Sequence, residues 1–225
     1  MESIFIRVFV FLIVLIFSDD VTRISSIYLR SICVSSLPDS IGVLTCLADL
    51  NFRDNQLTRL PASIGSLNSL SILYLGKNRL TRLPDSIGDL TYLVRLGVDN
   101  NYLKYVPDSI GKLTYLTSLN VRDNRLTHLP DSIGNLAALT ILYVGNNAIT
   151  HLPDSIGNLA SLTRLFIGNN QLICIPDSIG NLACLRYLYV GDNPITSTVQ
   201  GMIEVKRRFQ KDGLSVDLLD MESYD

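Results

Sequence analysis

Three residues with metal-binding side chains recur at one interval along this chain. His128, His151 and Cys174 each follow the previous one by 23 residues. If the segments that carry them lie side by side like parallel strands, the three side chains form a column with a spacing of about 5 Å. Imidazole and thiolate groups are zinc ligands. However, earlier segments hold arginine or tyrosine at this position, and no fourth ligand is evident. We therefore interpret the column as ordinary surface and expect no bound metal.

The rest of the sequence offers no catalytic set either. It contains no phosphate-binding loop, no nucleophile elbow and no H-E-x-x-H motif. We therefore expect a protein that is not an enzyme and that uses no cofactor and no small-molecule substrate. The net charge of −2 over 225 residues gives no basic excess, which argues against a nucleic-acid partner.

The interval between these residues belongs to a repeat that runs through most of the chain. A Leu-Pro-Asp-Ser-Ile-Gly motif begins at Leu37 and recurs, with small variations, until Ile175. A second series places an asparagine at the same 23-residue step, at Asn55, Asn78, Asn101, Asn124, Asn147, Asn170 and Asn193. A fixed period of roughly 20–29 residues predicts a solenoid whose stacked units share one continuous core.

Each unit reads L-x-x-L-x-[LFVI]-x-x-N-x-[LI], as in Leu116, Leu119, Val121, Asn124 and Leu126. The alternation of apolar and polar residues predicts a short strand with one buried face, which pairs in parallel with the strand of the next unit. The asparagine should turn the chain out of the strand and bond backbone groups that would otherwise be unpaired, so we expect a structural ladder of seven amides. The Pro-Asp-Ser-Ile-Gly half predicts a short helical turn on the opposite side, capped by an aspartate or serine oxygen.

These units resemble the 23-residue class of leucine-rich repeats. That class occurs in plant intracellular Ras-group-related proteins, in animal scaffolds of the Scribble and Erbin type, and in bacterial effectors. The resemblance covers about residues 24–196. It implies an α/β solenoid: a curved right-handed horseshoe with a parallel β-sheet on its concave face and short helical turns on its convex face. For function it implies only the binding of another protein, and our leading hypothesis is a scaffold or effector in signalling.

The repeat pattern divides the chain into three parts. Residues 1–23 are an apolar segment, for which three interpretations stay open: a hydrophobic cap on the first repeat, a signal or anchor sequence, and a misassigned start. Residues 24–196 form the repeat domain, with a degenerate first repeat and seven full repeats. Residues 197–225 should form a capping helix, whose buried face we expect to include Ile203, followed by an acidic tail.

Cysteine usage and glycosylation motifs bear on the compartment. Extracellular leucine-rich repeat proteins usually seal their ends with disulfide-rich caps, and the four cysteines here form no such pattern. No asparagine stands in an N-x-[ST] sequon. Both observations favour the cytoplasm, which is the host cytoplasm if the chain is a bacterial effector. The alternative is a secreted or membrane-anchored recognition protein, attached through residues 3–17. We expect a membrane contact only if residues 1–20 act as an anchor.

The repeat register also identifies the side chains that face solvent on the predicted sheet. In the last three repeats several of them are aromatic, which a solvent-facing sheet does not need, and aromatic residues with arginine are typical anchors of binding sites. The same composition also arises where aromatic residues simply favour strands, or where a terminal segment folds over them. We predict that this surface of a monomeric chain binds another protein. The predicted contact residues are Ile141, Tyr143, Arg164, Phe166, Tyr187 and Tyr189, with Tyr74 on an earlier repeat.

Overall fold

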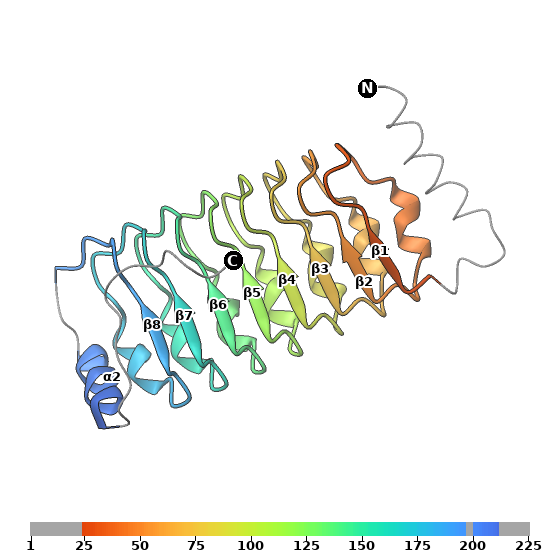
Figure 1. Cartoon of the computed structure of the whole chain (residues 1–225). Coiled ribbons are helices and arrows are strands. Elements are labelled where there is room, and N and C mark those ends of the chain that lie inside the picture. Colours follow the sequence, from red (N-terminus) through yellow and green to blue (C-terminus); the bar gives the residue numbers. More distant parts are fainter. Residues whose placement is uncertain (1–23, 197–199, 212–225) are drawn as a thin grey trace.

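A computed structural model describes residues 24–196 and 200–211 of the chain (Figure 1). Short parallel strands lie side by side along one face of an open solenoid, and 3-10 helical turns lie along the opposite face. The strands are β1 (Ser26–Tyr28), β2 (Asp49–Asn51), β3 (Ile72–Tyr74), β4 (Arg95–Gly97), β5 (Ser118–Asn120), β6 (Ile141–Tyr143), β7 (Arg164–Phe166) and β8 (Tyr187–Tyr189). The helical turns are η2 (Asp39–Val43), η3 (Ala62–Ser66), η4 (Asp85–Asp89), η5 (Asp108–Lys112), η6 (Asp131–Asn135), η7 (Asp154–Asn158) and η8 (Asp177–Asn181), and the helix α2 (Gln200–Lys211) follows. This arrangement is the α/β solenoid that the sequence predicts.

The strands pair in sequence order, from β1 to β8, in a single parallel sheet. Every pair keeps the same register, so that each residue faces the residue 23 positions later, as Leu142 faces Leu165. The central residue of each strand points into the core and the two flanking residues point outward. Because side chains alternate between the two faces of a strand, the repeat interval fixes which residues share a column on the sheet.

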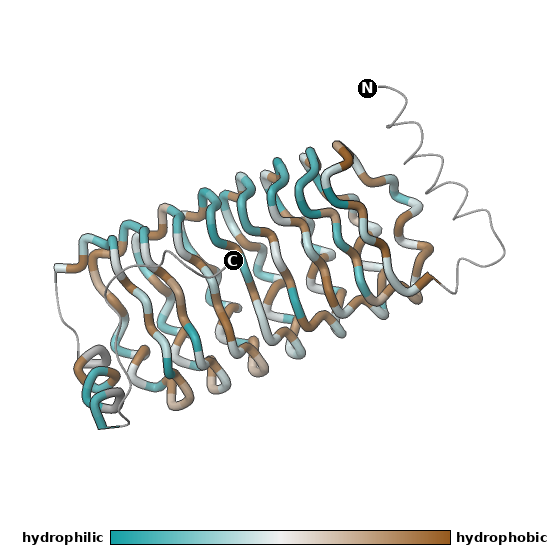
Figure 2. The backbone as a smooth tube through the Cα atoms, viewed as in Figure 1, coloured by the Kyte–Doolittle hydropathy of each residue, from teal (hydrophilic) through white to brown (hydrophobic). Residues whose placement is uncertain are grey.

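The core is one continuous stack of aliphatic side chains that runs the length of the described solenoid. Leu50, Leu73 and Leu142 on the strands are completely buried, and so are Ile64 and Ile133 on the convex turns. Figure 2 shows hydrophobic and hydrophilic residues recurring at matching places in successive coils. No single unit could bury such a face alone, so each unit depends on its neighbours for its stability.

The convex turns begin differently from the sequence prediction. We expected an aspartate or serine oxygen to cap each turn, but each turn follows a proline in extended conformation and has no side-chain capping bond. The serine instead packs against the preceding repeat. A Cβ atom added at Gly134, for example, would lie 2.5 Å from the carbonyl oxygen of Ser155 and 2.8 Å from its Cβ. The glycine is therefore needed because the convex turns approach one another so closely.

The turn after each strand is held by the asparagine series. The Nδ2 group of Asn78 donates to the carbonyl of Leu75 at 2.9 Å and to the carbonyl of Phe52, in the preceding repeat, at 2.9 Å. Its Oδ1 accepts from the N–H of Leu57, also in the preceding repeat, at 2.9 Å. The other six asparagines make the equivalent three bonds. Each amide thus joins two successive repeats through their backbones.

Helix α2 packs against η8, at the C-terminal end of the solenoid. Val205 is completely buried in this contact, whereas Ile203 is 47% exposed. The expectation that Ile203 faces the last repeat is therefore wrong. Helical periodicity alone leaves the rotation of a helix open where two apolar positions compete, and the docking against η8 selects Val205. The apolar segment 1–23 and the residues 197–199 and 212–225 lie outside the described residues.

Candidate functional site

The solvent-facing side of the sheet, here called the concave face, presents two columns of side chains. The first column consists of the first residue of every strand and the second of the last residue. Because adjacent strands of a sheet lie about 4.8 Å apart, large side chains in one column touch their neighbours. The composition of the columns changes along the solenoid, from mixed polar residues at β1 and β2 to mainly aromatic ones at β6, β7 and β8.

Two aromatic rings form the centre of the C-terminal half of the concave face. Tyr143 on β6 and Phe166 on β7 lie with their ring centroids 4.7 Å apart and their planes 8° from parallel. Both side chains are only partly buried. A stacked pair of this kind forms one continuous aromatic surface across two strands, here called the ridge.

A charged side chain and a third ring flank this ridge. The guanidinium carbon of Arg164, in the first column of β7, lies 5.4 Å from the ring centroid of Tyr187 on β8. Arg164 is exposed and Tyr187 is 51% exposed. Ile141, which pairs with Arg164 across β6 and β7, is partly buried beside them. The cation–π contact orients the guanidinium while leaving it accessible to a partner.

The remaining two predicted contact residues differ in their position relative to the ridge, because Tyr189 pairs with Phe166 across β7 and β8 whereas Tyr74 lies on β3. The ring of Tyr189 covers Gly168, where an added methyl group would overlap it. Tyr74 on β3 leans onto Gly97, with its Cδ1 atom 2.9 Å from the position of an added Cβ. Two strands, β4 and β5, separate Tyr74 from Tyr143 on β6. The structure therefore groups the residues of β6, β7 and β8 and leaves Tyr74 outside that group. We define the aromatic patch as Ile141, Tyr143, Arg164, Phe166, Tyr187 and Tyr189.

The histidine column lies on the flank of the solenoid, outside the concave face. The Nδ1 atom of His128 lies 3.1 Å from the hydroxyl of Thr127, and that of His151 lies 3.0 Å from the hydroxyl of Thr150. Across residues 24–196 and 200–211, no three histidine, cysteine or acidic side chains gather as a metal site would require. The two histidines are exposed.

The sequence that builds this geometry matches a known family. The family model described as "Leucine-rich repeat region" matches residues 26–104 and 98–206, which together make up most of the chain. This chain is a leucine-rich repeat protein. The fold of this family is generally a non-enzymatic fold for protein interaction. No curated protein matches the sequence.

Solved structures of other leucine-rich repeat proteins resemble this one. A leucine-rich repeat protein of Leptospira interrogans is 31% identical, with a TM-score of 0.64, and the match covers 86% of this chain and 54% of that protein. A TDR receptor is 27% identical with a TM-score of 0.72, over 78% of this chain and 32% of the receptor chain. The PEPR1–AtPEP1 structure is 31% identical with a TM-score of 0.63, over 72% of this chain and 27% of that chain.

The leucine-rich repeat protein described here thus spans about half the length of the Leptospira protein and about a third or less of the other two chains. Within the described parts of its own chain, no helix is long and apolar enough to cross a membrane.

Proposed function

We propose that this leucine-rich repeat protein is a non-catalytic interaction module that binds another protein through the aromatic patch of its concave face. The observation that carries the proposal is the stacked pair of Tyr143 and Phe166, whose rings lie 4.7 Å apart on neighbouring strands. The core is complete without these rings, because the central residues of β6 and β7 are already fully buried on the other side of the sheet. An aromatic pair that the fold does not need is best explained by a partner.

The surroundings of the pair suit a protein partner. Tyr187 and Arg164 offer a hydroxyl and a guanidinium beside an apolar ridge, and such a combination is typical of the central residues of protein interfaces. The proposal includes a monomeric chain that acts as a scaffold or effector in the cytoplasm. The absence of a disulfide pattern and of glycosylation motifs from the sequence supports this compartment.

Quantitative affinity capture tests the proposal. The immobilised full chain and a variant carrying Tyr143→Ser and Phe166→Ser are incubated with the same cell extract, and bound proteins are quantified by mass spectrometry. A second variant, with Tyr92→Ser and Tyr115→Ser, is the matched control, because it deletes another stacked aromatic pair, with centroids 6.1 Å apart. We expect at least one protein to be retained by the wild type and the control and lost from the concave variant. Identical capture by all three would refute the proposed surface.

A receptor-type role is the second candidate function, favoured by the likeness to the TDR receptor and to PEPR1 in its structure with AtPEP1. In that case residues 3–17 would direct the chain to secretion or hold it at a membrane. Sequencing the N-terminus of the mature protein separates the two. The cytoplasmic role predicts a chain that starts at or next to Met1, and the receptor-type role predicts removal of the apolar segment or its recovery with membranes.

A further inference from the structure

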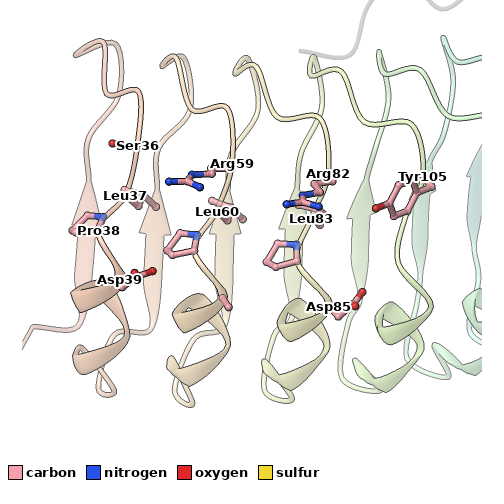
Figure 3. A pocket seen from close by; sticks show the side chains of 13 residues that line it. Ser36, Leu37, Pro38, Asp39, Arg59, Leu60, Arg82, Leu83, Asp85 and Tyr105 are labelled. Carbon is pink, nitrogen blue, oxygen red and sulfur yellow. The ribbon is translucent and has the colours of Figure 1, made fainter.

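A groove runs along the flank of the solenoid, on the segments that lead from the asparagine turns to the convex 3-10 turns. It consists of two adjoining cavities with volumes of about 510 and 1100 Å³, which share Asp85 and Tyr105 among their lining residues. Figure 3 shows the first cavity, where prolines such as Pro38 lie between a row that includes Arg59, Arg82 and Tyr105 and the row of Asp39 and Asp85. From the sequence alone, this flank is interpreted as ordinary surface.

The two walls of the groove carry opposite charge. One wall, here called the cationic wall, consists of Arg59, Arg82, Lys104 and Arg125. The other, the acidic wall, consists of Asp39, Asp85, Asp108 and Asp131. All eight side chains are exposed, and within the described parts of the chain none of them takes part in an ion pair. The groove therefore holds exposed charges of both signs that form no ion pair with each other, and one of them, the Arg125 guanidinium, lies 4.5 Å from the ring centroid of Tyr102.

A short extended segment separates the two walls where Arg82 and Asp85 line the groove. Arg82 and Asp85 lie three residues apart, and Pro84 between them is in extended conformation, with φ −71° and ψ 152°. Three residues of extended chain span about 10 Å between Cα atoms, which is about the width of one extended polypeptide with its side chains. A peptide lying along the groove would fit between the walls over the prolines.

We propose that the flank groove binds an extended peptide segment of another protein in which acidic and basic side chains alternate. In an extended chain successive side chains point to opposite sides. Acidic side chains at every second position would therefore face the cationic wall, and the basic side chains between them would face the acidic wall. Guanidinium groups of Arg59 and Arg82 can bind carboxylates in a bidentate manner.

The acidic wall argues against a nucleic acid in the same groove. A nucleic-acid strand carries one negative charge per nucleotide and no basic group, so a strand that fills the groove would bring phosphates beside the aspartates as well as beside the cationic wall. A polypeptide with only acidic side chains has the same difficulty, since half of its carboxylates would face Asp85 and Asp108. An alternating segment is the polymer that leaves neither wall unpaired.

Fluorescence anisotropy with labelled probes and the full chain at low salt tests the inference. The probes are an alternating Glu-Lys decapeptide, a decapeptide with the same composition in two blocks, an all-Glu decapeptide and a single-stranded DNA decamer. We expect the alternating peptide to bind at least about fivefold more tightly than each of the other three, because only it matches both walls along its length. Tighter binding of the all-Glu peptide or of the DNA would overturn the proposal.

Charge variants distinguish the two walls. Arg59→Glu with Arg82→Glu, and separately Asp85→Lys with Asp108→Lys, should each weaken binding of the alternating peptide about tenfold. The control, Arg95→Glu with Arg186→Glu, makes the same change of charge at exposed residues that do not line the groove, and should change affinity less than twofold. Tighter binding of the alternating peptide to the aspartate variant would show that the groove selects polyanions and would overturn the proposal. Wild-type affinity of either groove variant would show that the peptide does not bind in the groove. None of these outcomes depends on the aromatic patch.

Discussion

Arg53 and Asp99 form a bidentate ion pair that skips one whole repeat. The Nη1 and Nη2 atoms of Arg53 lie 3.0 and 2.9 Å from the two carboxylate oxygens of Asp99, across Gly76 of the repeat between them. Asp99 is only 3% exposed. A Cβ atom at Gly76 would lie 2.5 Å from Asp99 and 2.7 Å from Arg53, so the glycine leaves the space that the pair occupies.

This pair should stabilise the N-terminal half of the solenoid. Arg53→Ala would leave a buried carboxylate without its partner, and we expect a loss of about 1–3 kcal/mol, the lower values reflecting the partial exposure of the arginine. Urea unfolding measures it. The control is Arg95→Ala, an exposed arginine outside any ion pair in the described residues, which should cost less than about 0.5 kcal/mol. Equal losses would show that the pair contributes nothing specific.

Lys77 is the residue least suited to its place in the turn that precedes each ladder asparagine. It has a φ of 55°, and the equivalent residues of the other full repeats, also at positive φ, are all aspartate or asparagine. The left-handed conformation costs other L-residues roughly 1–2 kcal/mol, and asparagine tolerates it better. We therefore expect Lys77→Asn to raise the free energy of unfolding by about 0.5–1 kcal/mol. Lys104→Asn, at a residue without positive φ, should not stabilise, and a larger gain there would contradict the role given to the φ angle.

The convex glycines should tolerate no side chain. Gly134→Ala would place a methyl group against the backbone of Ser155, and we expect a loss of about 1–3 kcal/mol from the forced separation of two repeats. The comparison is Gly145→Ala, where the nearest atom to the added Cβ is the Gly168 carbonyl oxygen at 3.1 Å, a contact that a small shift relieves. The melting temperatures of both variants test this explanation. If the melting temperature falls more for Gly145→Ala than for Gly134→Ala, close packing between the convex turns is not the reason for the glycine.

The structural role of the asparagine series can be tested at Asn101, which is one of its buried members. Asn101 is 5% exposed and its amide bonds the carbonyls of Leu75 and Val98 and the N–H of Leu80. Asn101→Ala would leave these groups unpaired, which costs roughly 1–3 kcal/mol for each buried group before any water enters. Asn68 is exposed and outside the series, so Asn68→Ala should be near neutral. Similar unfolding midpoints for the two variants would count against a structural role for the amides.

Most of the fold can be predicted from the repeat period. An interval that is constant from Leu50 to Leu188 determines the strand register, the core column and the order of the sheet, because the core and the strands of each unit pack on those of its neighbours. Contacts between particular side chains of different repeats could not be predicted from the period. The pair of Arg53 and Asp99, separated by 46 residues, shows no pattern in the sequence.

The same limit applies to the candidate sites. The aromatic columns follow from the period, but the stacking of Tyr143 on Phe166 and the turn of Tyr189 over Gly168 depend on rotamers. The flank groove could not be recognised in the sequence, because only Arg59 and Arg82 of its cationic wall share one register, and arginine near proline is not by itself a binding pattern. The sequence does contain one indication of the groove. Arg59 and Arg82 occupy the same position of successive repeats, and in both repeats no acidic residue lies between the arginine and the proline that follows it.

The central claim is that the aromatic patch binds a protein partner, and affinity measured by calorimetry with a captured partner tests it most directly. Removing both rings of the Tyr143–Phe166 pair should raise the dissociation constant well over tenfold, since a central interface ring contributes about 2 kcal/mol or more. Removing the Tyr92–Tyr115 pair, which is also stacked and about equally apolar, should change it less than twofold. A dissociation constant that is unchanged by Tyr143→Ser with Phe166→Ser, together with binding that is lost with Tyr92→Ser and Tyr115→Ser, would place the binding surface elsewhere and contradict the proposal.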